Sequence, residues 1–159
     1  MSNSLTKSFD DLNLRSREHN RGPVRLPIPP NNSHGRRMYY GFETTEAWVI
    51  EYAKADIRKR EQPPDPPYSS MRLFSESIRL LRMHSGILYL RGESVFPEGT
   101  TIPPYSTNYQ KSDKAPEGRA IIVAIYSSSK WSNLPSQAQV DKLQQIMGGR
   151  EAKWWVSDI

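Results

Sequence analysis

The 159-residue chain contains no cysteine, and this absence excludes disulfide bonds, thiolate metal ligands and cysteine nucleophiles. Long apolar runs are also missing, since no stretch approaches the ~20 consecutive apolar residues of a membrane-spanning helix. The first residues lack the apolar run that a signal peptide carries. We therefore expect a cytoplasmic protein, with the nucleus as the alternative, that is not secreted and has no membrane partner.

Acidic residues are scarce near the N-terminus. Residues 1–37 hold seven Lys and Arg against three acidic side chains, so +4 of the net charge of +5 lies there. The remaining residues carry only +1, which argues against nucleic-acid binding by the folded part. Nucleic-acid binding led by the basic tail stays as an alternative, and its affinity would fall steeply with salt.

Residues 1–36 have few apolar side chains and no sustained period, which predicts a disordered, basic, proline-containing tail. Two short patterns within this tail are typical of docking motifs. Leu5, Phe9 and Leu12 have the spacing of a helix that lies in a groove. Residues 26–30, Leu-Pro-Ile-Pro-Pro, favour polyproline II. The alternative for both patterns is a plain linker.

Residues 37–159 have the periodicity of one folded domain. Apolar alternation, capping residues and Gly or Pro breaks predict strands at 38–42, 87–90, 120–126 and 153–156, and helices at 46–60, 71–84 and 137–147. Residues 92–118 show no period and predict a long loop. The order β-α-α-β-β-α-β predicts an α+β fold, a ferredoxin-like split βαβ sandwich with an antiparallel sheet and helices on one face.

The face of this sheet away from the helices would be rich in apolar and aromatic side chains. Because neighbours on a strand alternate, Ile122, Ala124 and Tyr126 would share one face, together with one tyrosine of 39–40 and one tryptophan of 154–155. An apolar face of this kind needs a cover. The candidates are the chain's own loop 92–118 or proline-rich connections, a second copy of the chain, a small ligand, or nucleic acid stacked on the aromatic rings.

The candidate binding residues follow from this open face and from the long loop. Loops carry a disproportionate share of binding residues, so the loop tyrosines and a lysine are included with the sheet residues. The candidates are Tyr89, Ile122, Tyr126, Tyr105, Tyr109 and Lys111.

Residues for catalysis are few. The chain has three histidines, of which His19 and His34 lie in the tail and His84 lies at the end of a predicted helix, where it suits the helix dipole. No paired His and carboxylate, metal-ligand spacing or phosphate-binding glycine loop is present. We predict no catalytic residue, no metal site and no cofactor.

The function predicted from these patterns is a non-enzymatic interaction or scaffolding domain, whose partner is another protein or, through the open sheet face, a second copy. The first alternative is a small-ligand-binding domain or enzyme of the dimeric α+β barrel type. The second is nucleic-acid binding led by the basic tail.

Three segments carry a resemblance to a known group. They are YYGFETTEAWVIEYA at 39–53, LPSQAQVDKL at 134–143 and KWW at 153–155. The chain resembles small proteins of mushroom-forming (agaricomycete) fungi, which open with a short strand and helix and close with a tryptophan-containing strand. The resemblance covers roughly residues 38–157 and implies no activity.

Overall fold

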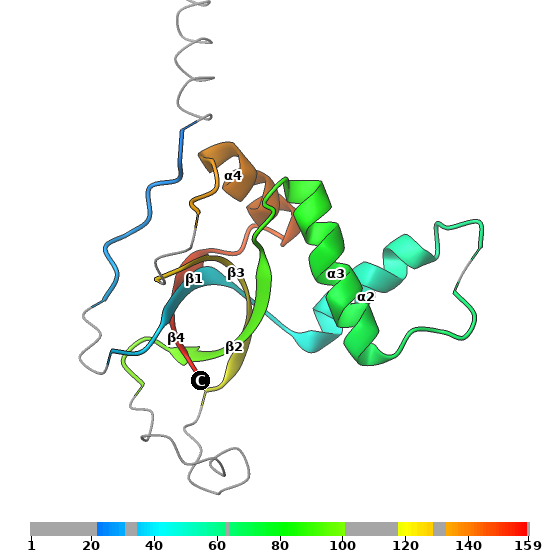
Figure 1. Ribbon diagram of the computed structural model, residues 1–159, viewed down its shortest axis with the longest axis horizontal. Helices are drawn as coiled ribbons and strands as arrows, with labels where there is room; N and C mark the ends of the chain where they lie inside the picture. Colours follow the sequence, from blue (N-terminus) through cyan, green and yellow to red (C-terminus); the bar gives the residue numbers. More distant parts are fainter. Residues whose placement is uncertain (1–21, 31–34, 63, 101–117, 129–132, 159) are drawn as a thin grey trace, which may run out of the picture.

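A computed structural model describes residues 22–30, 35–62, 64–100, 118–128 and 133–158. The described elements form an α+β fold in which four strands make a ring, with helices grouped beside it (Figure 1). Tyr105, Tyr109 and Lys111 lie outside the described residues. The elements in chain order are β1 (Met38–Thr44), α2 (Glu46–Ile57), α3 (Ser70–Ser85), β2 (Arg91–Pro97), β3 (Ala120–Ser127), α4 (Gln137–Ile146) and β4 (Ala152–Ser157).

The sequence offers Thr44 or Thr45, Ser69 or Ser70, and Ser136 as helix caps, and the helices begin after Thr45, Ser69 and Ser136. The side chains of Thr45 and Ser69 each accept a hydrogen bond from a backbone N–H in the first turn of α2 and α3. Ser136 and Gln139 form a reciprocal capping box at the start of α4. Gly86 ends α3 in the left-handed conformation, with a φ of 79°. Helix positions were therefore predictable from local chemistry.

The sheet is antiparallel throughout, but it is not the open sheet of a ferredoxin-like sandwich. The strands close into a barrel in the order β1-β3-β2-β4. Closure comes from β2, whose last residues pair with β4 from Val95 opposite Ser157 to Pro97 opposite Trp155. The expectation of an open sheet face is therefore wrong, because closure turns one face of the sheet into the barrel interior, which buried side chains fill.

The second strand lies four residues later than expected. Residues 87–90 form a turn after α3, which Arg82 holds by donating two hydrogen bonds, of 2.8 and 2.6 Å, to the carbonyl oxygen of Leu90. The strand itself begins at Arg91 and runs to Pro97, so most of it lies in the predicted loop 92–118. Its glycine, Gly92, makes room for the ring of Phe74, because a Cβ there would lie 2.4 Å from a ring carbon.

Three apolar clusters fill the fold. One lies between the barrel and the helices and includes Phe42, Val123 and Leu143. A second lies on another part of the outer surface of the barrel and includes Trp154 and Phe96. The third fills the barrel interior. Its members are Tyr39, Val95, Ile122, Ala124 and Trp155.

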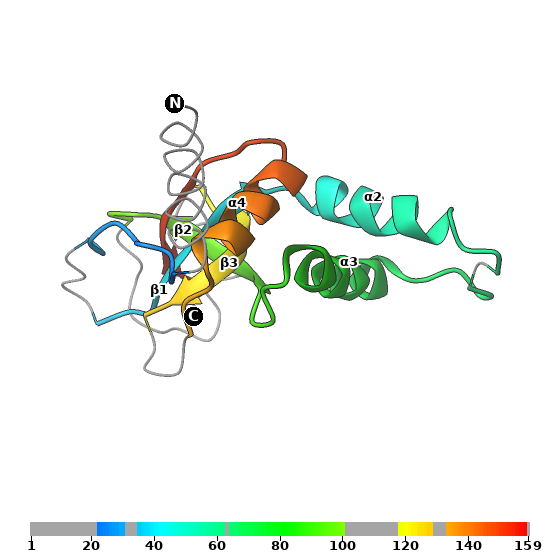
Figure 2. The same cartoon turned by 90° about the horizontal axis from the view of Figure 1, so that it is seen from above.

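Helices α2 and α3 pack on each other and project away from the barrel as an arm (Figure 2). Arg60 joins the two sides of this arm at its outer end, since it contacts Asp56 at 3.0 Å and Glu76 at 2.5 Å. None of the described helices has the length and apolarity that crossing a bilayer requires.

Candidate functional site

Three aromatic side chains from three neighbouring strands lie together on the outside of the barrel. Tyr40 of β1 is paired in register with Tyr126 of β3 on one side and with Trp154 of β4 on the other. The ring of Trp154 makes edge contacts with Tyr40 at a centroid distance of 5.2 Å and with Tyr126 at 6.1 Å. We call these three residues the aromatic surface. Burial raises the pKa of the Tyr40 hydroxyl, and the nearby Glu151 carboxylate adds to the rise.

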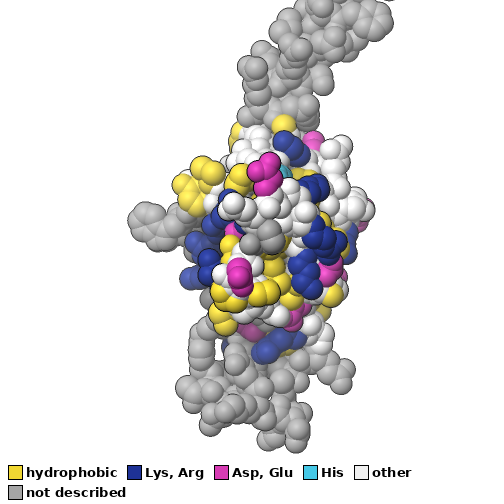
Figure 3. Space-filling view, turned by 90° about the vertical axis from the view of Figure 1, so that its right-hand side faces the viewer, with side chains coloured by type: hydrophobic (Ala, Val, Ile, Leu, Met, Phe, Trp, Pro, Cys, Tyr) yellow, Lys and Arg dark blue, Asp and Glu magenta, His cyan; other side chains and the backbone are white. Residues whose placement is uncertain are grey.

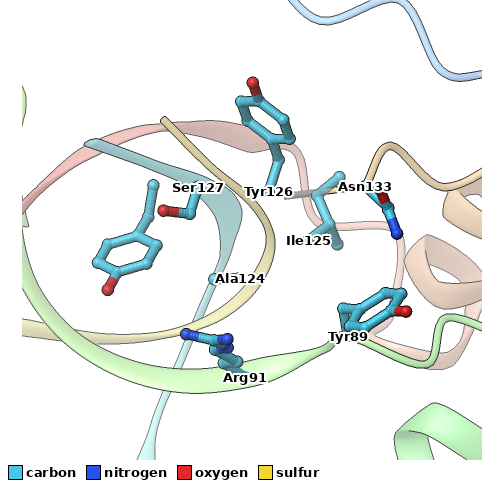
Figure 4. Close-up of a pocket in the computed structure, with 8 residues that line it drawn as sticks. Tyr89, Arg91, Ala124, Ile125, Tyr126, Ser127 and Asn133 are labelled. Carbon is cyan, nitrogen blue, oxygen red and sulfur yellow. The ribbon is translucent and has the colours of Figure 1, made fainter. Parts of the chain in front are cut away.

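Tyr126 reaches this surface because of an irregularity in β3. Tyr40 pairs with Tyr126, but the next residue of β1, Gly41, pairs with Ala124, so β3 has one extra residue at this point. Such a bulge breaks the alternation of side chains. Tyr126 therefore points outward while Ser127 points into the ring of strands (Figure 4).

The bulge separates two residues that the sequence placed on one face. Ile122 lies fully buried in the barrel interior, with no exposed surface, whereas Tyr126 is half-buried on the outside. The prediction that Ile122 is a binding residue on an open face is therefore wrong. The alternation rule holds as far as Ala124, and it then fails because the bulge adds a residue.

The aromatic surface is covered by residues 22–30, which we call the strap. The strap runs beside the barrel before β1 begins (Figure 1). The indole nitrogen of Trp154 donates a hydrogen bond of 3.1 Å to the carbonyl oxygen of Pro27. Leu26 packs against two apolar clusters, and Tyr40 and Tyr126 of the aromatic surface pack against the same two. The predicted tail 1–36 therefore includes a segment that is packed on the domain.

The other end of the strap is fixed by its backbone. The N–H of Val24 donates to the carbonyl of Pro135 at 2.8 Å, and the N–H of Gln137 donates to the carbonyl of Gly22 at 3.1 Å. These bonds make a short antiparallel bridge between Pro23 and Ser136. Two kinds of contact thus hold the strap, a strand-like pairing at one end and an aromatic contact at the other.

The strap also alternates like a strand. Val24 is buried and Leu26 is half-buried, whereas Pro23, Arg25 and Pro27 are exposed. Val24 belongs to the same buried cluster as residues of α4, so it is part of the core. Ile28 follows with 93 % of its surface exposed and makes no comparable contact. The side-chain contacts of the strap are therefore concentrated at Val24 and Leu26, beside the backbone hydrogen bonds of Gly22, Val24 and Pro27.

This arrangement has the chemistry of peptide recognition. Proline-rich segments dock on surfaces lined by aromatic rings, because proline limits the backbone and leaves its carbonyl groups free to accept hydrogen bonds. Trp154 supplies both an aromatic ring and a donor at such a surface. Two residues of the pattern Leu-Pro-Ile-Pro-Pro at 26–30, which the sequence offered as a docking motif or a plain linker, make contacts here, through the Leu26 side chain and the Pro27 carbonyl.

Tyr89 lies outside the strands that carry the aromatic surface, but it lines the same small pocket as Tyr126 (Figure 4). It is in the turn before β2 with 57 % of its surface exposed, next to Leu88, which is 73 % exposed. Both residues line a shallow open pocket together with Asn133 and Leu134. Of the sheet residues that the sequence grouped together, the structure places Tyr89 and Tyr126 at one small pocket and buries Ile122 in the barrel interior.

The barrel interior holds a polar group that sequence reasoning missed. Glu93 of β2 pairs with the interior residue Ile122 and is half-buried. Burial raises the pKa of Glu93, against the smaller lowering effects of Arg91 and of a hydrogen bond from the Tyr39 hydroxyl. The sequence places Glu93 in the predicted loop 92–118. The signal that locates it is the alternation of Glu93 and Val95 toward the interior.

The interior has little space for a ligand. Val95, Ile122 and Trp155 are almost completely buried within it. A small pocket at one end, lined by Tyr39, Tyr89 and Tyr126 among others, has a volume of about 30 Å³, which is room for about two water molecules (Figure 4). Within the described residues there is also no group of three or more His, Asp and Glu side chains that could hold a metal ion.

Comparisons of the chain with protein-family models, with curated proteins and with solved structures found no match. The resemblance to small fungal proteins stays a prediction. The function must therefore be argued from the strap and the aromatic surface.

Proposed function

We propose that the chain is a non-enzymatic intracellular interaction domain, which binds a proline-containing segment of a partner protein on the aromatic surface. The observation that carries the proposal is the hydrogen bond from the Trp154 indole to the Pro27 carbonyl, within an aromatic cluster completed by Tyr40 and Tyr126. A surface that accepts a proline-rich segment from its own chain has the chemistry to accept one from another protein.

A homodimer through the sheet is not part of this proposal. That dimer required an open sheet face, and the inner face here is filled by Ile122 and Trp155. A pocket of the dimeric α+β barrel type required the same face. The small space at the barrel end argues against this alternative too.

Nucleic-acid binding led by the basic tail stays as a second alternative. Most of that tail lies outside the described residues. On the side where α2 and α3 project, acidic and basic side chains are interspersed (Figure 3). A mixed surface of this kind does not favour nucleic acid, so a steep loss of affinity with salt would have to come from the tail.

The proposal is tested by cutting the chain without changing any described residue. A protease site placed in residues 31–34 allows the strap to be separated from β1 while Val24, Leu26 and Pro27 stay native. After cutting, a fluorescein-labelled peptide of residues 22–30 is added, and fluorescence polarisation follows its binding. We expect saturable binding, because the cut strap can now exchange with the free peptide.

The matched controls change one tryptophan at a time in the cut chain. Trp154→Phe removes the indole donor and should weaken peptide binding. Trp48→Phe is the same replacement on α2, away from the aromatic surface, and should leave the affinity unchanged. The proposal fails if the labelled peptide does not bind to the folded, cut chain, or if the Trp154→Phe and Trp48→Phe chains bind it equally.

A further inference from the structure

We infer that the partner segment has the pattern aliphatic-x-Leu-Pro, and that the strap, residues 22–30, occupies its site until the partner displaces it. This inference rests on the proposed function and gives that function a ligand class. It follows from how each position of the strap meets the domain.

The aliphatic position corresponds to Val24. Its side chain is 7 % exposed and belongs to the cluster that includes Val140 and Leu143 of α4. Its N–H donates to the Pro135 carbonyl, and Gly22 accepts from Gln137. A peptide must therefore enter this end as an extended strand, and a polar side chain at the Val24 position would be buried without a partner.

The next position is unrestricted. Arg25 is exposed, as expected where an extended chain turns alternate side chains outward. Ile28, beyond the Pro27 carbonyl, is 93 % exposed despite being apolar. Neither position contributes to recognition, so a partner can carry any soluble residue there.

The leucine and proline positions meet the aromatic surface. Leu26 packs against the same two apolar clusters as Tyr40 and Tyr126. Pro27 offers its carbonyl to Trp154 and fixes its own backbone φ angle, which lowers the entropy lost on binding. A run of prolines without the aliphatic and leucine positions would keep the low entropy loss on binding but would lose the buried contacts of Val24 and Leu26.

The strap competes with any partner because it belongs to the same chain. A short flexible link gives a tethered ligand an effective concentration in the millimolar range. The apparent affinity for a free peptide falls by the fraction of chains whose site is empty. We therefore expect the native chain to bind the partner pattern weakly and a strap-weakened chain to bind it at least about tenfold more tightly.

The experiment compares three full-length chains with three labelled peptides. The first chain is native. The second carries Val24→Ser/Leu26→Ser, which weakens the strap. The third carries Ile28→Ser, which changes only an exposed strap residue. The peptides are residues 22–30, the same peptide with Val24→Ser/Leu26→Ser, and an all-proline peptide of equal length. Circular dichroism checks that each chain is folded.

We expect tight binding for one combination only, the strap-weakened chain with the native-sequence peptide. The Val24→Ser/Leu26→Ser chain should bind the native-sequence peptide about tenfold or more tightly than the native and Ile28→Ser chains do. It should bind the other two peptides at least about tenfold more weakly than the native-sequence peptide. Equal affinity for the all-proline peptide would overturn the pattern while leaving the proposed function standing.

Two further outcomes separate the inference from the proposed function. Equal affinity of the native and strap-weakened chains for the native-sequence peptide would overturn the competition by the strap. Failure of every peptide to bind would overturn the proposed function itself. If the Val24→Ser/Leu26→Ser chain does not fold, the chain cut in residues 31–34 takes its place, and the same three peptides then test the pattern.

Discussion

Trp154 and Trp155 are neighbours in β4, yet their indole nitrogens bind on opposite sides of the barrel wall. Trp154 donates to Pro27 of the strap at 3.1 Å, and Trp155 donates to the Gly41 carbonyl at 3.2 Å. The reason is the alternation of side chains along a strand. One tryptophan therefore belongs to the proposed binding surface, and the other belongs to the core.

The same replacement at the two tryptophans should have different consequences. Trp155 is 1 % exposed, so Trp155→Phe leaves a cavity and an unpaired carbonyl and should lower the free energy of unfolding by about 1–3 kcal/mol. Trp154→Phe should cost less and should mainly weaken peptide binding. Urea unfolding measures the first effect and fluorescence polarisation the second. Equal losses of stability would contradict this division.

Gly41 is required by the close approach of β1 and β3 at the bulge. A Cβ at this position would lie 2.4 Å from the carbonyl oxygen of Val123, which is backbone and cannot rotate away. Gly41→Ala should therefore lower the free energy of unfolding by about 1–3 kcal/mol or more, measured by urea titration. Gly92→Ala is the comparison, because its Cβ would meet the Phe74 ring, which can move. A larger loss for Gly92→Ala would contradict the argument.

Much of the local structure was predictable because local signals determine it. The capping residues Thr45, Ser69 and Ser136 and the glycine stop Gly86 lie where the sequence places them. The strand 120–126 also lies where a continuous apolar run predicts it. These features depend on neighbours within a few positions, so one sequence is enough to find them.

The barrel closure and the binding surface depend on distant pairings. The apolar run at 87–90 is more hydrophobic than Arg91–Pro97, but the run forms a turn and the mixed segment forms the strand. The bulge that turns Tyr126 outward is visible only once β1 and β3 are aligned. The proline pattern at 26–30 could be read from the sequence, whereas its contact with Trp154 could not.

Glu76 should stabilise the contact between α2 and α3. Its hydrogen bonds with Arg79 and Arg60 hold its pKa at about 2. The pKa is depressed in the folded protein, so this stabilisation is present above the ordinary carboxyl pKa and is lost as pH falls toward 2. Glu76→Gln should lower the free energy of unfolding by about 1–2 kcal/mol at neutral pH, after allowing for partial screening. Thermal unfolding across pH 2–7 measures the change.

Glu51 provides the matched control for this prediction. It also contacts two basic side chains, Lys54 at 3.3 Å and Arg58 at 2.8 Å, but the side chains of this group are half-exposed or more. Exposed ion pairs contribute little, so Glu51→Gln should leave the unfolding curve nearly unchanged. Equal effects of Glu76→Gln and Glu51→Gln would show that burial of Glu76 is not what matters.

Glu93 should make the barrel less stable as pH rises. Burial raises its pKa above the ordinary value of 4.5, although Arg91, Arg37 and the Tyr39 hydroxyl act in the opposite direction and Asp158 adds to the rise. A raised folded-state pKa contributes stability that is fully present below the unfolded pKa and is lost as pH rises through the folded pKa.

Glu93→Gln removes the ionisation and keeps the shape, so its melting temperature relative to the native chain reports on this effect. We expect the melting temperature of the variant to rise relative to that of the native chain as pH rises from about 4.5 to 8, because only the native chain must bury a charge there. Glu61→Gln, an exposed site on the helical arm, should show no such trend. If the melting temperature of Glu93→Gln instead falls relative to that of the native chain as pH rises, the ionised carboxylate stabilises the barrel through Arg91 and Tyr39.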